Sequence, residues 1–328
     1  MKRNQNSGAN VKIFLRYLLT LIVVALVGFF FYREFQENWD TVSVHHLSFN
    51  FYYLAAAIMV TAAGFLLETY IWHIFVNDYL VRKLTFRDSM ALYNTTAMLK
   101  YIPGKVWSYA AQITLTSSRG ISKSLLIYIN VICFICLIFS SGAYALYYYL
   151  FYLKTLPLTI SAMICGLFFI LFFIFVRRNT AIINYLINLI NRIFRRDIQP
   201  VKIRKSLLLY IQLLYLLDYI PAGCGMYLLA RGIGLDIPFS SIAALTAALA
   251  VSLVSGYIVF FSPGGLGVRE GTMLLILKQF STVHAALILP LAMRLIYIII
   301  ELFLGAIGIL LSMKSGLFAA CLKTGFKK

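Results

Sequence analysis

Charged side chains are scarce in this sequence: they make up 12% of its 328 residues, whereas hydrophobic residues make up 62%. A soluble domain cannot hide so large an apolar fraction, because its own surface would become apolar. A bilayer core requires about 20 apolar residues for each helical span. Such stretches recur from Ile13 to Ser312. The composition therefore predicts an all-α polytopic membrane protein and excludes a soluble globular domain.

Acidic residues are fewer still, 11 against 29 Lys and Arg, which gives a formal net charge of +18. The basic residues gather in the connections between apolar stretches and in both terminal tails, which is the positive-inside pattern. In those places they face the anionic lipids of a cytoplasmic leaflet. We therefore predict a multi-pass protein of the bacterial plasma (inner) membrane, with both termini in the cytoplasm and no nucleic-acid partner.

Motifs of enzyme chemistry and cofactor binding are also missing. The four histidines are scattered, and there is no H-x-x-x-H, aspartate-rich, G-x-S-x-G or nucleotide-loop motif. The single C-x-x-C, Cys133 and Cys136, lies in an apolar run without a nearby histidine or third cysteine. That setting favours packing over redox or metal chemistry. The sequence therefore predicts no enzyme, no metal site and no cofactor, and it argues against ATP-driven pumping.

The apolar stretches predict about six full spans and two broken or re-entrant segments. The spans are expected at 13–32, 51–76, 125–152, 157–176, 207–230 and 285–311. The broken segments are 90–118 and 241–283, and both contain Pro-Gly, which interrupts a helix. Basic residues at both ends of the first segment predict a hairpin that returns to its starting side. The second segment is also long enough to cross fully, so both topologies stay open for it.

The two halves of the chain correspond in pattern. Repeat A (about 51–152) and repeat B (about 207–311) each contain a span, a broken segment and a span. Such paired interruptions indicate an inverted-repeat transporter. Between the repeats, 177–205 contains eight basic residues against one acid, with apolar residues at helical spacing. We interpret it as a basic amphipathic connector on the cytoplasmic surface, with a solvated linker as the alternative.

Breaks in membrane helices expose free backbone N–H groups, which bind phosphate. Basic and aromatic side chains accompany both breaks. The candidate substrate-binding residues are Lys100, Pro103, Gly104, Lys105 and Trp107 at the first break, and Pro263, Gly264, Gly265, Gly267, Arg269 and Glu270 at the second. Helix packing is the alternative role for the breaks, and an interfacial position is the alternative for Trp107.

Charges within the spans are a second signal, because each costs about 2.5–3.5 kcal/mol on insertion scales. We expect them to be buried charge partners or to line a pathway. These residues are Glu68, Asp218, Arg294 and Glu301. Arg294 and Glu301 are seven positions apart and so share a helix face. Structural ion pairing alone is the alternative for Glu68 and Asp218.

Three blocks resemble the signature segments of one family: KYIPGKVW (100–107), RGISKS (119–124) and SPGGLGVRE (262–270). This is the flippase-like transmembrane domain of lysylphosphatidylglycerol synthases, the bacterial multiple peptide resistance factor, and the resemblance covers nearly the whole chain. It implies that the proline and glycine residues of both breaks, with Arg269 and Glu270, form the characteristic core. Many members have a glycine-containing run where this chain has Lys105 and Trp107, so the head group bound at the first break stays open.

The resemblance implies transport of a lipid. Full-length members append an aminoacyl-transferase domain that uses charged tRNA, whereas this chain stops at Lys328, so we expect that domain, and lysyl transfer, to be absent. The leading hypothesis is a protein that translocates or scrambles an anionic phospholipid, an aminoacylated phospholipid or a lipid-linked glycan precursor. The alternative is a non-catalytic partner of a glycosyltransferase or lipid-modifying synthase, docked through the basic connector at Arg195 and Arg196. Homo-oligomer formation stays open.

Overall fold

The computed structural model describes residues 48–101, 106–117, 121–152, 157–194, 204–259, 265 and 267–314, together with Tyr32 and Gln36. Its helices are α3 (Phe51–Tyr79), α4 (Phe86–Ala97), the 3₁₀ helix η1 (Met98–Tyr101), α5 (Val106–Ser117), α6 (Lys123–Leu146), the π-helical η2 (Tyr147–Tyr152), α7 (Leu158–Phe194), α8 (Lys205–Gly232), the 3₁₀ helix η3 (Phe239–Ser241), α9 (Ile242–Ile258), α10 (Val268–Leu277) and α11 (Val283–Lys314). These ranges contain no β-strand. The predicted all-α class is confirmed.

Six helices of the described part are long and apolar enough to cross a bilayer: Phe51–Tyr79, Lys123–Leu150, Thr159–Ile182, Lys205–Gly232, Phe239–Ile258 and Val283–Met313. Five coincide with expected spans. The expected span at 13–32 lies outside the described residues, apart from Tyr32. Phe239–Ile258 is the first half of the second broken segment, so this half is of span length, whereas α10 beyond the break has ten residues.

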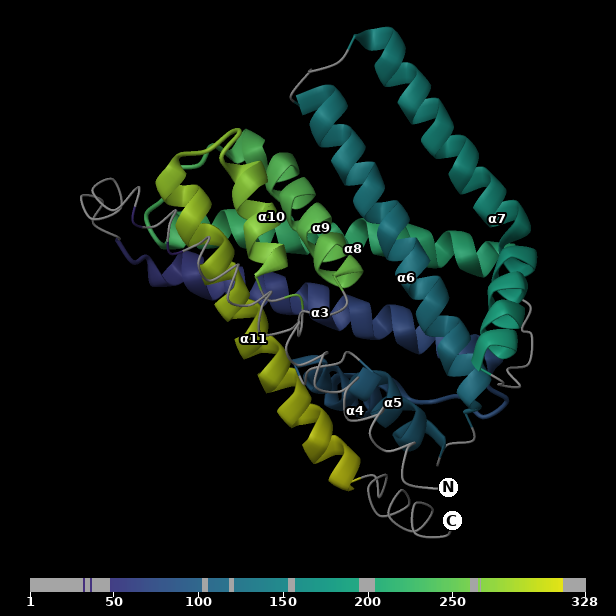
Figure 1. Cartoon of the computed structure of the whole chain (residues 1–328). Coiled ribbons are helices and arrows are strands. Elements are labelled where there is room, and N and C mark those ends of the chain that lie inside the picture. The colour runs from purple at the N-terminus through teal and green to yellow at the C-terminus, as the bar shows by residue number, and fades with distance from the viewer. Residues whose placement is uncertain are drawn as a thin grey trace, which may run out of the picture.

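Helices α3 and α8 form an antiparallel pair across the middle of the molecule (Figure 1). At one end the backbone N–H of Asn50 donates to the carbonyl of Gly232 over 2.8 Å. At the other end Arg204 forms an ion pair with Asp78. A Cβ on Gly225 would come within 2.3 Å of Thr61 Oγ1, so glycine permits this close approach.

Each broken segment forms a helical hairpin. The first consists of α4, η1 and α5, and the residues that flank it, Leu84 and Ile121, are buried in one cluster. The second consists of α9 and α10, and Ile237 before α9 shares a second cluster with Leu277 at the end of α10. In each hairpin the two helices pack against each other, α4 against α5 and α9 against α10.

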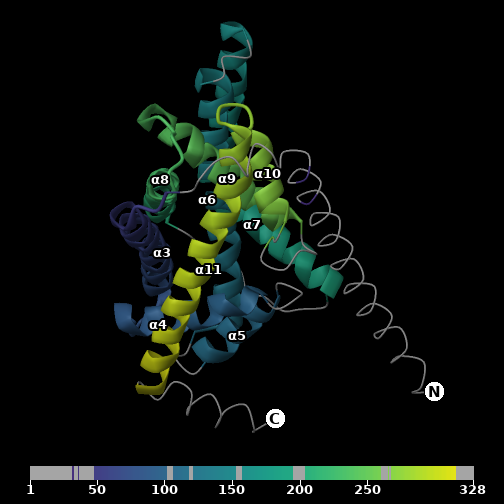
Figure 2. The ribbon, with the colours of Figure 1, turned by 90° about the vertical axis from the view of Figure 1, so that its left-hand side faces the viewer.

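Each hairpin packs against a helix from the other half of the chain. Helix α4 lies along α11, and α9 lies along α6. Figure 2 shows α11 running past α10 at one end and α4 at the other. An inverted repeat would produce this reciprocal packing; the repeat itself stays a prediction.

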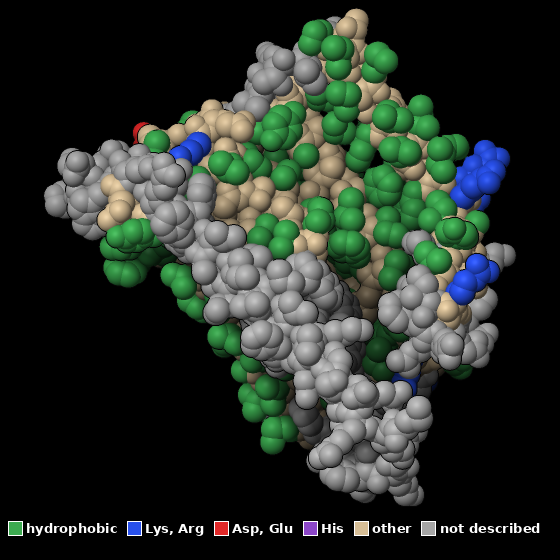
Figure 3. Space-filling view, viewed as in Figure 1, with side chains coloured by type: hydrophobic (Ala, Val, Ile, Leu, Met, Phe, Trp, Pro, Cys, Tyr) green, Lys and Arg blue, Asp and Glu red, His purple; other side chains and the backbone are tan. Residues whose placement is uncertain are grey.

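Helix α7 lies at the edge of the bundle and has an apolar, exposed surface. Met163, Phe169 and Phe173 are more than half exposed, and hydrophobic side chains spread over α6 and α7 in Figure 3. A lipid environment accounts for such a surface. Residues 177–194 of the expected basic connector continue α7 without interruption rather than forming a separate helix. Its placement at the membrane surface stays a prediction, and residues 195–203 lie outside the described part.

Candidate functional site

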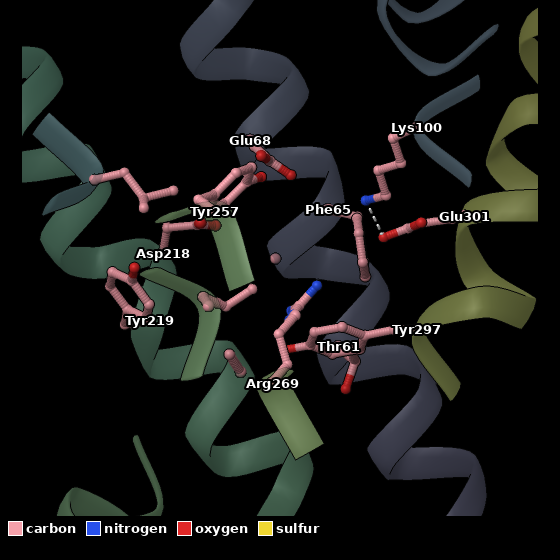
Figure 4. A pocket seen from close by; sticks show the side chains of 14 residues that line it. Thr61, Phe65, Glu68, Lys100, Asp218, Tyr219, Tyr257, Arg269, Tyr297 and Glu301 are labelled. Carbon is pink, nitrogen blue, oxygen red and sulfur yellow. Dashed lines mark hydrogen bonds and ion pairs between the residues drawn. The ribbon is translucent and has the colours of Figure 1, made fainter. Parts of the chain in front are cut away.

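Two adjoining cavities lie where the hairpins meet α3, α8 and α11, with volumes of about 70 and 270 Å³. The residues that line both are Phe65, Glu68, Lys100, Leu253, Tyr257, Arg269 and Glu301. Four of these seven are ionisable residues singled out from the sequence. The structure thus brings together charges that the sequence places on α3, η1, α10 and α11 (Figure 4).

Lys100 and Glu301 form an ion pair within the site. The Lys100 Nζ donates to Glu301 Oε1 over 2.6 Å, and the Glu301 side chain is 5% exposed. Lys100 lies in η1 immediately before the first break, and Glu301 lies in α11. A buried ion needs such a partner, because leaving either charge unpaired costs several kcal/mol. The contact therefore joins the first hairpin to α11.

Arg269 reaches the cavities through a gap formed by two glycines. A Cβ on Gly256 would lie 2.4 Å from Arg269 Cγ, and a Cβ on Gly265 would lie 2.8 Å from Arg269 Cδ. Gly265 also has a φ of +73°, which favours glycine. The guanidinium carbon lies 5.7 Å from the centre of the Tyr297 ring, a cation–π contact. Within the described residues no carboxylate forms an ion pair with Arg269, so its charge is available to an anion.

Glu270, the neighbour of Arg269, points elsewhere. Its Oε2 accepts from the backbone N–H of Gly267 over 2.5 Å, capping α10, and its Oε1 lies 3.4 Å from Arg294 Nε. Neither Glu270 nor Arg294 lines either cavity. One oxygen of Glu270 therefore caps α10, and the other connects α10 to α11. Arg294 and Glu301 share α11, as their spacing predicts, but bind partners in different elements.

Two further acids face the site, Glu68 from α3 and Asp218 from α8. The Asp218 Oδ1 lies 3.8 Å from the position of a Cβ on Gly64, one helical turn before Glu68. Glu68 interacts electrostatically with Lys100, and the two acids interact with each other. Within the described part neither acid forms an ion pair closer than 4.0 Å, and structural ion pairing stays the alternative to a pathway role.

The larger cavity joins the charged groups to an apolar space. Asn130 Nδ2 donates to Gln112 Oε1 over 2.7 Å in its wall. Asn130 and Phe134 also line a third cavity of about 240 Å³ between α5 and α6. The remaining residues of that third cavity are Ile113, Ile127 and Val131. A cavity with charged groups in its wall therefore adjoins an apolar one, which suits an amphiphilic molecule.

Some predicted site residues lie outside the described residues: Pro103, Gly104, Lys105, Pro263 and Gly264. Trp107 lies in the first turn of α5, but its side chain also falls outside the description. Sequence reasoning missed Tyr257, Tyr297, Gln112 and Asn130. Tyr297 had a signal, because it lies three residues after Arg294 and four before Glu301 and so shares their helix face.

The fold and its charged interior define a multi-pass membrane protein with an internal polar cavity. The sequence matches the family described as lysylphosphatidylglycerol synthase TM region over residues 15–305. The chain belongs to this family. Its membership associates the protein with lipid modification or translocation. A comparison with curated proteins finds no match.

Proposed function

We propose that this protein moves an anionic lipid between the two leaflets of a bacterial plasma membrane. The observation that supports this most directly is Arg269, a cation in a cavity that adjoins an apolar one. Moving a lipid head group through a bilayer requires a polar path, because a charge in hydrocarbon is costly. The tail of the same molecule requires an apolar one. The adjoining cavities offer both.

The site residues have distinct roles in this proposal. Arg269 binds the lipid phosphate through charge-assisted hydrogen bonds. Lys100 is positioned by Glu301 in the wall of the cavity, where its ammonium group donates hydrogen bonds although the ion pair as a whole carries no net charge. The hydrocarbon chain lies against Ile113 and Phe134. No bond of the lipid is made or broken, so the protein acts as a transporter rather than an enzyme.

Proteoliposomes with tail-labelled phosphatidylglycerol, lysyl-phosphatidylglycerol or a polyprenyl-phosphate analogue test the proposal. A membrane-impermeant quencher reports the fraction of label that reaches the outer leaflet. A hydrogen bond to a charged group contributes about 1.5–3 kcal/mol, so we expect Arg269→Ala to slow at least one lipid roughly 10- to 150-fold. Arg231→Ala is the matched control, because Arg231 pairs with the exposed Asp236 and neither residue lines any of the three cavities. Equal rates for wild type and Arg269→Ala would contradict the assignment of the site.

A second candidate function is a docking partner for a glycosyltransferase or lipid-modifying synthase. It is favoured by the long α7, whose second half carries exposed Arg177, Arg178 and Arg192. Charge reversal at Arg177 and Arg178 would then abolish copurification of a specific membrane enzyme and leave lipid movement unchanged. Copurification that withstands this charge reversal would count against docking through α7.

A further inference from the structure

The smaller cavity has more acidic than basic side chains. Three carboxyl groups line it, from Glu68, Asp218 and Glu301, against the two cations Lys100 and Arg269. With every group ionised, the cavity would hold one excess negative charge. An uncompensated charge surrounded by protein and lipid is expensive. One bound proton would make the cavity neutral.

The contacts identify where that proton binds. Glu301 forms an ion pair with Lys100 at 2.6 Å, and the guanidinium of Arg269 forms a cation–π contact with the Tyr297 ring. Glu68 interacts with both cations, whereas the charged group that acts on Asp218 is the Glu68 carboxyl. Asp218 is therefore the acid of this cavity without a cation beside it. Figure 4 shows both acids among the side chains that line the cavity.

Phenols and a thiol form the remaining titratable surroundings of the two acids. Those facing Glu68 are Tyr93 of α4, Cys133 of α6, Tyr215 of α8 and Tyr257 of α9. Those facing Asp218 are Tyr144 of α6, Tyr219 of α8 and Tyr297 of α11. The cations are Lys100 and Arg269, and the remaining acid is Glu301. The phenols and the thiol are neutral at ordinary pH, so they leave the charge count unchanged.

We propose that Glu68 and Asp218 form a proton-binding site that is coupled to lipid binding at Arg269, so that one proton crosses with each lipid anion. This inference rests on the proposed function. An anion bound at Arg269 adds one negative charge to a neutral cavity and engages the cation that Glu68 faces. A second proton, taken from water in the cavity by the remaining carboxylate, restores neutrality. Binding linkage is reciprocal, so the proton strengthens lipid binding as much as the lipid strengthens proton binding.

Coupling has a quantitative consequence. Movement of one proton together with each singly charged lipid anion is electroneutral, so a pH difference across the membrane drives the lipid in the same direction as the proton. One pH unit corresponds to a factor of about ten at equilibrium. Lipid therefore leaves the leaflet on the acidic side until the other leaflet contains about ten times as much of it. Uncoupled scrambling ends with equal amounts of the lipid in the two leaflets, whatever the pH gradient.

The transport test uses the same tail-labelled lipids with an imposed one-unit pH gradient and the membrane potential clamped at zero. We expect a leaflet ratio of about ten for wild type and close to one for Asp218→Asn and Glu68→Gln. Asp236→Asn is the matched control, because Asp236 is exposed and pairs with Arg231. Protein-free vesicles under the same gradient correct for passive redistribution. A wild-type ratio of one, or a ratio that follows a sodium gradient instead, would overturn the proposal.

An infrared measurement tests the proton site without transport. Purified wild-type protein at neutral pH should show the carbonyl stretch of a protonated carboxylic acid, shifted in D₂O. This band should weaken in Asp218→Asn and persist in Asp236→Asn; a band that is absent or unaffected by Asp218→Asn would overturn the proton site. If wild type moves no lipid under any gradient, the proposed function and the coupling fail together. The infrared band then decides the proton site by itself.

Discussion

Replacing Gly256 with alanine tests how Arg269 reaches the cavity. The new Cβ would lie 2.4 Å from Arg269 Cγ and 2.8 Å from Cδ, both shorter than any normal contact. The Cα of Gly265 lies 3.4 Å away on the other side of the gap, so the arginine stem has little room beside it. We expect the stem to leave the gap, taking the guanidinium away from Tyr297 and the cavity.

The size of the effect follows from the cost of this overpacking. Inserting a methyl group into a well-packed site costs about 1–3 kcal/mol. If that cost falls on the placement of Arg269, the initial rate of lipid movement drops roughly 5- to 150-fold. The quenching assay in proteoliposomes measures that rate. The Tm in detergent should change little, because the side chain moves while the helices stay in place.

Gly271→Ala is the control for this experiment. Gly271 lies in α10 two residues after Arg269, and a Cβ there meets no atom within 4 Å. It should keep the wild-type rate, because alanine is favourable inside a helix. A wild-type rate for Gly256→Ala, or equal losses for the two variants, would refute the argument that these glycines admit Arg269.

Three other substitutions probe the surroundings of the site. Glu301→Gln removes the carboxylate that Lys100 contacts at 2.6 Å. Breaking a buried ion pair costs about 3–5 kcal/mol, so the Tm should fall, and it should recover partly when Lys100→Met is added. An unchanged Tm would contradict this prediction. Glu270→Gln weakens both the cap of α10 and the contact with Arg294; a lower Tm is expected, and no loss would show that α10 is held by packing alone. Phe134→Trp should narrow the apolar cavity. In side-by-side quenching assays it should slow lipids with long acyl chains more than lipids with short ones. Equal slowing of both would show that the acyl chain does not lie in this cavity.

The sequence predicted much of the fold because apolar length and helix-breaking residues act locally. Spans such as 207–230 and 285–311 coincide with α8 and α11. The second broken segment was harder. Hydropathy measures whether a helix is long enough to cross, and α9 with η3 is long enough. The return of the chain through α10 depends on the packing of α10 against α9, which no local pattern encodes.

The site was predicted in its charges and missed in its neutral polar groups. Lys100 and Arg269 stand out because they accompany the Pro-Gly breaks, and Glu301 stands out because a charge in an apolar run is costly and rare. Tyrosine, asparagine and glutamine do not stand out, so Gln112 and Asn130 remained unnoticed. The pairing of Lys100 with Glu301 joins positions 201 residues apart. Such a contact follows from the packing of the first hairpin on α11, which helical periodicity within one segment does not reveal.

Helix α11 connects to both hairpins through one face. Arg294, Tyr297 and Glu301 follow each other at helical spacing, and their partners are Glu270, Arg269 and Lys100. Two of these contacts lie inside the cavity and one lies outside it. A phosphate bound at Arg269, as proposed, would compete with Tyr297 for that cation, whereas Glu270 and Arg294 line neither cavity. Under the proposed function we therefore expect head-group binding at Arg269 to weaken one contact between α10 and α11, while the Glu270–Arg294 contact keeps these two helices together.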